Sequence, residues 1–133
     1  MIAVDTNVVV RLFTRDDQQQ FERAGACFVE AEVFIPDSVL LETAWVLESV
    51  YSFDDRQIAA ALRKLLGMPN VRSSESAAMA DALDWYERGL DLADAIHLAK
   101  SQHADEFRTF DRSLVSDAAG VGRCRVMEPP ANE

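Results

Sequence analysis

Cysteine is scarce in this chain of 133 residues, which contains only Cys27 and Cys124. Two cysteines so far apart in sequence exclude a disulfide framework and the closely spaced ligand pairs of a structural zinc site. We expect both side chains to be reduced thiols in the core, as in the reducing environment of the cytoplasm.

Long apolar runs and a basic amino-terminal segment are also lacking. No run approaches the roughly 20 apolar residues that are needed to cross a bilayer. No basic region precedes the first apolar stretch, and Asp5 and Asn7 interrupt it, so we expect no signal peptide. These absences predict a soluble, cytoplasmic protein that does not engage a membrane.

Positive charge is in deficit, with 13 Lys and Arg against 23 Asp and Glu, which gives a formal net charge of -10. The deficit is evenly spread, because residues 1–66 carry 6 basic and 11 acidic side chains and residues 67–133 carry 7 and 12. This balance excludes nucleic-acid binding through a broad basic surface. It leaves two possibilities: action on a polyanion with the help of divalent cations, or binding of a basic partner protein.

The composition, 49% apolar and 27% charged, is that of a globular protein, and the length suits one domain. Without repeats, linkers or low-complexity segments, we expect a single domain over residues 1–130, followed by a tail at 131–133. Five short apolar segments read as strands and alternate with amphipathic helices, two of which follow each of the first two strands. The predicted strands are residues 2–4, 33–36, a brief one around 71, 106–110 and 123–127. This order predicts an α/β fold, a three-layer α/β/α sandwich with a short, mostly parallel five-stranded sheet.

Helix boundaries are predicted from residues that commonly cap helices. Acidic or hydroxyl side chains precede several helical segments, and Gly67 closes one of them. The predicted amino-terminal caps are Asp16 or Asp17, Asp37 or Ser38, Asp54 or Asp55, and Asp91.

Four acidic residues fall where a strand or turn passes into the next element. Asp5 ends the first strand and Asp111 follows the fourth, while Glu42 and Asp94 lie near the starts of helices. Because the carboxyl ends of parallel strands meet at one edge of a sheet, we expect these acids to converge there. Each also has an ordinary structural interpretation: a turn for Asp5 and Asp111, a solvent-facing position for Glu42 and a helix start for Asp94.

Converging carboxylates repel one another unless a cation joins them. Carboxylate oxygens and water suit Mg²⁺ or Mn²⁺, whereas zinc favours His and Cys ligands in an ordered spacing that this chain lacks. Metals held by acids activate water and stabilise the leaving oxygen in phosphodiester hydrolysis. The sequence therefore points to metal-dependent phosphodiester chemistry.

Four stretches in this order, "VDTNVVVRL", "LLETAWVL", "LADAIHLA" and "TFDRSL", resemble the motifs of PIN-domain ribonucleases, particularly the VapC-type toxins of bacterial toxin–antitoxin pairs. The resemblance covers nearly the whole chain. It implies a compact parallel sheet flanked by helices, bound Mg²⁺ or Mn²⁺, endonucleolytic cleavage of RNA, a homodimer and inhibition by a cognate antitoxin. By position, Asp5, Glu42, Asp94 and Asp111 would be the catalytic and metal-binding acids.

The resemblance also implies supporting residues. Asn7 would hydrogen bond to Asp5, and Thr109 would be a polar neighbour of the metal. Asp91, three residues before Asp94, is either a further ligand or only a helix cap. An acidic groove would also suit an arginine of the antitoxin.

Other residues near the motifs have weaker interpretations. The basic side chains of Arg11, Arg15 and Arg112 are candidates for contact with RNA phosphates, but surface charges need no such role. Trp45, Trp85 and Tyr86 follow helical patterns and are expected in the core or at a dimer surface.

Two alternative functions stay open. A receiver-type signalling domain also gathers aspartates at strand ends, but it requires an acidic pair near the first strand and a lysine after the fifth, and neither is present. A catalytically inactive PIN-like binding scaffold is compatible with the sequence, although all four acids are present.

Overall fold

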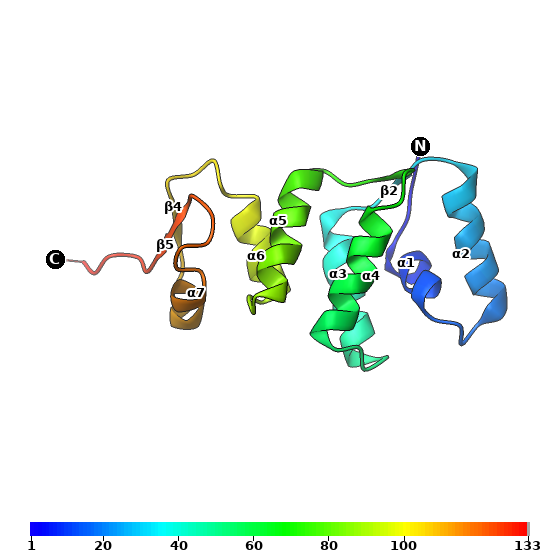
Figure 1. The fold of residues 1–133 in the computed structure, drawn as a ribbon, viewed down its shortest axis with the longest axis horizontal. Coiled ribbons are helices and arrows are strands. Elements are labelled where there is room, and N and C mark those ends of the chain that lie inside the picture. The colour runs from blue at the N-terminus through cyan, green and yellow to red at the C-terminus, as the bar shows by residue number, and fades with distance from the viewer. Residues whose placement is uncertain (133) are drawn as a thin grey trace. The chain divides into compact units, whose positions relative to one another are not determined.

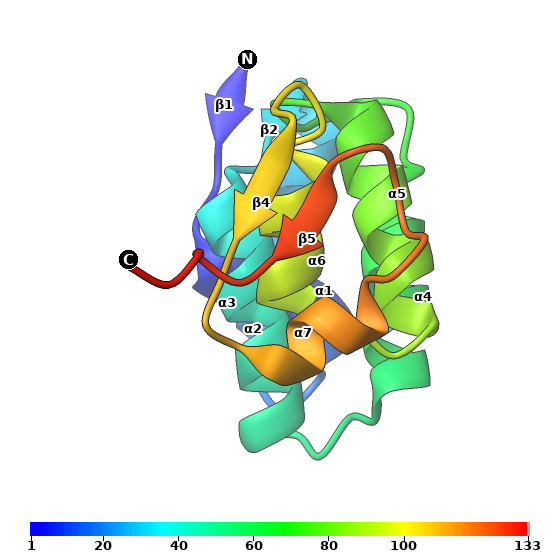
Figure 2. The ribbon, with the colours of Figure 1, turned by 90° about the vertical axis from the view of Figure 1, so that its left-hand side faces the viewer.

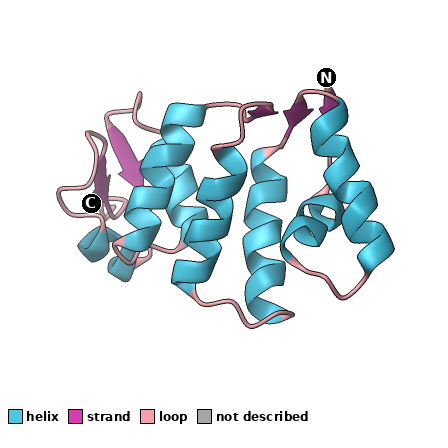
Figure 3. Cartoon of the chain, turned by 45° about the vertical axis from the view of Figure 1, so that its right-hand side comes forward, coloured by secondary structure: helices cyan, strands magenta, loops and turns pink. Residues whose placement is uncertain are grey.

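The computed structural model describes residues 1–132, which form two compact units. The N-terminal unit covers Met1–Ser76, and the C-terminal unit begins at Ala77. In both units the strands are only two or three residues long, and helices supply most of the structure (Figure 3).

The N-terminal unit contains three strands, each separated from the next by a pair of helices. Figure 1 shows these helices in blue to green. In chain order its elements are β1 (Ile2–Ala3), α1 (Thr6–Phe13), α2 (Gln18–Glu30), β2 (Val33–Phe34), α3 (Asp37–Ser49), α4 (Asp55–Leu66) and β3 (Val71–Arg72). The strands are parallel in the order β1-β2-β3, with Ile2 beside Val33 and Val33 beside Val71. Parallel neighbours require such crossover connections, so the predicted helix pairs after the first two strands are confirmed.

The core of this unit is formed where the apolar faces of its helices meet the short sheet. α1 contacts both α2 and α3, and α3 contacts α4. Residues with at most 2% of their surface exposed come from every layer: Val9, Val33, Ile35, Leu40, Leu47, Ile58, Leu62 and Leu65. The β2 segment supplies Val33 and Ile35, which are fully buried because helices cover the central strand.

Caps fix most helix starts as expected. The Asp17 carboxylate accepts a hydrogen bond from the backbone N–H of Gln20 at the start of α2. Asp54 and Gln57 form a reciprocal capping box at α4, which ends at Gly67. The prediction for α3 is wrong, because Pro36 occupies the cap position and no side chain caps the helix. Proline presets the backbone angle for helix entry, so Asp37 is already helical.

Thr43 on α3 is fully buried, and its hydroxyl is the only buried side-chain polar atom without a hydrogen-bond partner among residues 1–132. A buried, unpaired hydroxyl costs free energy that a methyl group of the same shape does not. We therefore expect Thr43→Val to raise the free energy of unfolding by about 1 kcal/mol. Urea unfolding followed by circular dichroism measures this change. Thr43→Ser, which keeps the hydroxyl and loses the methyl group, is expected to be less stable, and a Thr43→Val variant less stable than the parent would contradict the assignment.

The C-terminal unit consists of a helix pair followed by two strands that flank a short helix. Its elements are α5 (Ser76–Glu87), which begins at the boundary between the units, α6 (Leu92–Ala99), β4 (Glu106–Arg108), α7 (Arg112–Asp117) and β5 (Arg125–Met127). β4 and β5 lie side by side and parallel, with Phe107 beside Val126 (Figure 2). Gly89, in the turn between α5 and α6, has a φ of +116°, which a residue without a side chain adopts readily.

The α/β class and the five parallel strands are confirmed, but the strands belong to two sheets, of three and two strands. α7 is not foreseen from sequence, and four strands are shorter than predicted: β1 ends at Ala3, β2 at Phe34 and β4 at Arg108, while β5 begins only at Arg125. The single domain over 1–130 stays a prediction. In the predicted tail, residues 131 and 132 belong to no helix or strand, and residue 133 lies outside the described residues.

Both cysteines are free thiols, Cys124 buried and Cys27 half-buried. Burial, followed by the charges of Asp105 and Glu106, raises the pKa of the Cys124 thiol.

The aromatic residues Trp45, Trp85 and Tyr86 are expected from the sequence in the core or at a dimer surface. Trp85 and Tyr86 are buried, whereas Trp45 is 68% exposed. No helix within residues 1–132 has the length and apolar character to cross a membrane.

Candidate metal centre

Asp5 stands where β1 passes into α1. Its backbone is extended, and one carboxylate oxygen, Oδ1, accepts a hydrogen bond from the N–H of Val8 at 3.3 Å, so the side chain caps α1. The preceding residue, Val4, still donates its N–H to Phe34 of β2. The sheet therefore delivers Asp5 to its carboxyl edge, and the cap orients the carboxylate.

Glu42 lies on α3 and is joined to the same strand end through Thr6. The hydroxyl of Thr6, which is buried, donates a hydrogen bond to Oε1 of Glu42, although 36 residues separate them in sequence. Thr6 directly follows Asp5, so this bond ties the glutamate of α3 to the junction of β1 and α1. The N-terminal unit thus brings Asp5 and Glu42 into one neighbourhood, as expected from their positions after β1 and β2.

Asp94 occupies the first turn of α6, which Asp91 caps. The Asp91 carboxylate accepts a hydrogen bond from the backbone N–H of Asp94 at 3.1 Å. This contact gives Asp91 a structural role as a helix cap. Asp94 is half-buried, and its own carboxylate accepts no hydrogen bond within the part of the chain that the structure describes.

Asp111 follows β4 and caps α7. Its Oδ1 accepts three hydrogen bonds: from the Ser113 hydroxyl at 2.6 Å, from the Ser113 N–H at 3.0 Å and from the Leu114 N–H at 3.2 Å. Thr109 holds the same turn, because its hydroxyl oxygen accepts the N–H of Asp111 at 3.0 Å. Its own N–H donates to Met127 at 3.0 Å, which anchors the segment to the strand β5.

Each of the four acids, taken within its own unit, leaves at least one carboxylate oxygen without a protein hydrogen bond among residues 1–132. Asp5, Glu42 and Asp111 each use one carboxylate oxygen for protein hydrogen bonds, and over residues 1–132 the other oxygen of each accepts none. Partners that hold one oxygen orient the second, which is how ligand carboxylates are positioned in metal sites. The donor set is entirely oxygen, as Mg²⁺ and Mn²⁺ require. No preassembled group of three or more His, Cys, Asp or Glu residues suited to a metal is found within residues 1–132.

The electrostatic environments of Asp94 and Asp111 differ. Burial, then the negative charges of Asp91 and Asp111, raise the pKa of Asp94, while His97 opposes the shift. Hydrogen bonds, first from the Ser113 hydroxyl and then from the Leu114 N–H, hold the pKa of Asp111 below its usual range. A nearby cation would oppose the rise in the pKa of Asp94, because it favours the charged form of the carboxyl group.

The raised pKa of Asp94 predicts a pH-dependent effect on stability. In metal-free protein its ionisation is easier in the unfolded chain, so this group lowers stability as the pH rises through the carboxyl range, and the loss is complete at pH 7. Asp94→Asn, which stays neutral, is expected to be more stable than the parent at pH 7 by about 0.5 kcal/mol. The difference should shrink at acid pH, where both side chains are neutral.

Urea unfolding in EDTA at pH 7 and at acid pH measures this effect. Asp81→Asn, at an exposed position on α5, serves as the control for replacing an aspartate by asparagine on a neighbouring helix. A metal-free Asp94→Asn protein that is less stable than the parent at pH 7 would show that the interpretation is wrong.

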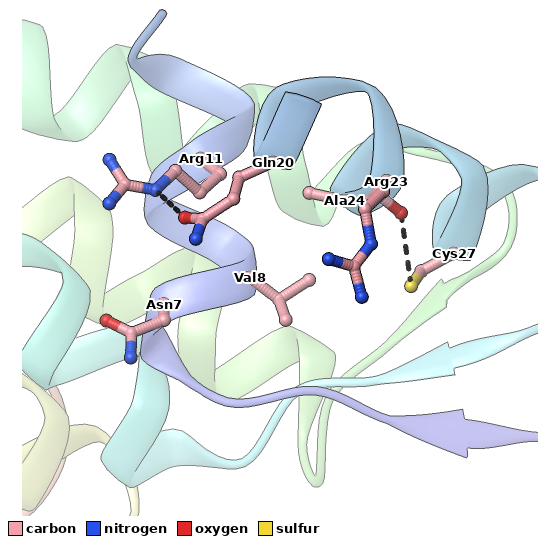
Figure 4. Close-up of a pocket in the computed structure, with 7 residues that line it drawn as sticks. All are labelled: Asn7, Val8, Arg11, Gln20, Arg23, Ala24 and Cys27. Carbon is pink, nitrogen blue, oxygen red and sulfur yellow. Dashed lines mark hydrogen bonds between the residues drawn. The ribbon is translucent and has the colours of Figure 1, made fainter. Parts of the chain in front are cut away.

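Asn7 faces a surface pocket between α1 and α2 instead of bonding to Asp5. The pocket, of about 440 Å³, is lined by Asn7, Val8, Arg11, Gln20, Arg23, Ala24 and Cys27 (Figure 4). The hydrogen bond expected between Asn7 and Asp5 is not found within residues 1–132. The neighbouring Thr6 bonds to a different acid, Glu42.

The three arginines near the motifs differ in how freely they reach solvent. Arg11 pairs with Asp16 at 2.7 Å and also donates to Gln20 and Tyr51, and Arg15 lies over the ring of Phe21 at 4.3 Å. Arg112 is 88% exposed, and its Nε reaches Glu128 only at 3.4 Å. Arg112 is thus the one of the three that remains most available to a ligand.

Ser113 is the supporting residue that sequence reasoning misses, because it makes two of the three hydrogen bonds to Asp111. The available signal is the spacing in "DRS", since a serine two residues after a capping aspartate reaches back to its carboxylate. That signal requires a helix after Asp111, which the sequence pattern does not indicate.

Parallel strands followed by acidic residues define this chain as an α/β protein of the kind that carries chemistry at strand ends. Residues 2–119 match the family model described as the PIN domain, so the chain belongs to the PIN-domain family, a family of nucleases. The chain is also similar to the crystal structure of VapC20 from Mycobacterium tuberculosis, described as a toxin that cleaves the sarcin–ricin loop. The identity is 21%, over 94% of this chain and 99% of that chain, with a TM-score of 0.42. No curated protein matches the chain.

Proposed function

We propose that this protein is an endoribonuclease that depends on Mg²⁺ or Mn²⁺ and hydrolyses phosphodiester bonds of RNA. Asp5, Glu42, Asp94 and Asp111 are its metal-binding, catalytic acids. The observation that carries the proposal is the free oxygen on each of these carboxylates in a chain of the PIN-domain family. Protein hydrogen bonds hold one oxygen of three of them and leave the other for a ligand.

In this proposal the residues around the acids have separate roles. A bound divalent ion would lower the pKa of a water molecule and stabilise charge on the phosphate. Thr6 fixes Glu42 by its hydroxyl hydrogen bond, while Ser113 and Thr109 fix the turn that carries Asp111. Asp91 holds the first turn of α6, and hence the backbone of Asp94, by its cap. Because these contacts already restrict the carboxylate side chains, less conformational entropy would be lost when they bind a metal ion.

The substrate and partners follow from the resemblance of the motifs to VapC-type toxins. We propose that the protein is the toxin of a type II toxin–antitoxin pair, that it forms a homodimer and that a cognate antitoxin inhibits it. A net charge of -10 and exposed acids suit a basic antitoxin segment whose arginine competes with the metal. Exposed Trp45 on α3 offers apolar surface for self-association.

Metal removal tests the proposed activity directly. Purified protein and end-labelled single-stranded RNA are incubated with Mn²⁺, with Mg²⁺ or with EDTA, and the products are separated on a gel. We expect cleavage with either ion, a loss of at least about 100-fold in EDTA, and recovery when Mn²⁺ is restored.

A preparation of Asp94→Asn protein, purified in parallel, controls for contaminating ribonuclease. Cleavage that survives both EDTA and this substitution would contradict the proposal. No cleavage under any metal condition would favour the inactive binding scaffold.

A further inference from the structure

Phe110 is an aromatic side chain left almost wholly in solvent beside a proposed metal ligand. The residue is 82% exposed, and it directly precedes Asp111 in the segment between β4 and α7. Phe107, three residues earlier on β4, is by contrast half-buried and lies in register with Val126. Of the two phenylalanines in this segment, only Phe110 is exposed.

The backbone on both sides of Phe110 is held in place. Thr109 donates its N–H to Met127 at 3.0 Å, and its hydroxyl accepts the N–H of Asp111 at 3.0 Å. Asp111 in turn is fixed by its bonds to Ser113 and Leu114. A ring on a fixed frame loses little conformational freedom when a flat ligand covers it.

The residues around Phe110 offer three complementary contacts. Next to the ring come the carboxylate of Asp111 and then Arg112, whose guanidinium is 88% exposed. Single-stranded RNA offers matching groups: a base with a π face, a phosphodiester and a neighbouring phosphate. The chain's net charge of -10 limits the affinity that phosphate contacts alone can supply. The net negative charge does not weaken the stacking of a base on the uncharged ring of Phe110.

We propose that Phe110 stacks on a base of single-stranded RNA next to the phosphodiester that the metal site cleaves, and that it thereby positions the substrate. This inference rests on the proposed ribonuclease function and adds a substrate-positioning residue to it. Arg112 contributes a phosphate contact on the same segment.

Binding of RNA without cleavage tests the stacking contact separately from activity. Fluorescence anisotropy of a labelled single-stranded RNA is measured with Ca²⁺ in place of Mg²⁺ or Mn²⁺, and a gel confirms that the RNA stays intact. We expect Phe110→Ala to weaken binding roughly tenfold, Phe110→Leu to weaken it nearly as much, and Phe110→Trp to retain it. Val29→Ala, which removes another exposed apolar side chain, on α2, is the control and should bind as the parent does.

Salt and an abasic RNA distinguish stacking from charge. The loss in Phe110→Ala should be the same at 50 and 200 mM salt, whereas the loss in Arg112→Ala should shrink as salt rises, by roughly the slope of one phosphate contact. An RNA with one abasic nucleotide beside the cleavage position should bind the parent as weakly as intact RNA binds Phe110→Ala.

Unchanged RNA affinity in Phe110→Ala, full affinity in Phe110→Leu, or no measurable RNA binding by the parent would each overturn the proposal. The same holds if Phe110→Ala changes only the sedimentation of the protein, because the ring would then contact a second copy of the chain. A parent protein that binds RNA through Phe110 but never cleaves it would contradict the proposed ribonuclease function and still support the stacking contact. If the parent cleaves RNA but substitution of Phe110 changes neither binding nor cleavage, the stacking contact is contradicted and the ribonuclease function stands.

Discussion

Asp5→Asn is expected to lower the rate of Mn²⁺-dependent RNA cleavage by at least about 10³-fold, because a neutral amide replaces the charged carboxylate of a proposed metal ligand. Asparagine caps helices about as well as aspartate, so α1 should keep its start and the fold its stability. The loss should therefore appear in metal affinity, measured by titration calorimetry, and in the cleavage rate. Expression of the variant should also no longer arrest growth, if the protein is a toxin.

Asp17→Asn provides a control matched in structure. Asp17 caps α2 with the same type of hydrogen bond to a backbone N–H that Asp5 makes at α1, but it is not among the proposed ligands. We expect Asp17→Asn to bind Mn²⁺ and cleave RNA as the parent does. Unchanged metal affinity in Asp5→Asn would show that Asp5 is only a cap.

Leu47→Ala is expected to give a large loss of stability. Leu47 on α3 is fully buried, and its removal leaves a cavity among side chains that cannot all close in. The free energy of unfolding should fall by about 2–5 kcal/mol, as measured by urea denaturation.

Trp45→Ala, two residues away on the same helix, tests whether the loss of stability depends on burial of the side chain or only on its location in α3. Trp45 is 68% exposed, so its truncation should change the free energy of unfolding by no more than about 0.5 kcal/mol in dilute solution. Equal losses in the two variants would contradict the assignment of α3's buried and exposed sides.

Several local features could be predicted because they depend on residues a few positions apart. The caps at Asp17, Asp54 and Asp91 are found where expected, since a side-chain cap reaches only two or three residues along the chain. The start of α3 fails the same reasoning because Pro36 enters the helix by its fixed φ angle and needs no side-chain cap. α7 escapes prediction because its six residues are too few to show a helical period.

The candidate site likewise has features that can be predicted from the sequence and features that cannot. Which acids stand after strands follows from the order of apolar and acidic residues, and so Asp5 and Asp111 are identifiable without coordinates. The hydrogen bond from Thr6 to Glu42 is not, because it joins residues 36 positions apart and exists only once α1 and α3 are packed together. Likewise, only the folded chain shows that Asn7 lines a pocket of α1 and α2 and that Phe110 is left in solvent.

The sequence by itself determined the α/β class, the parallel strands and the positions of the acids, because these depend on short-range periodicity and on where strands end. Only the tertiary structure decided that the strands form two sheets, that Thr43 is buried while Trp45 is exposed, and which carboxylate oxygens are free. The physical reason is that burial and long-range hydrogen bonds depend on how helices pack on one another, and many arrangements of side chains share the same local pattern.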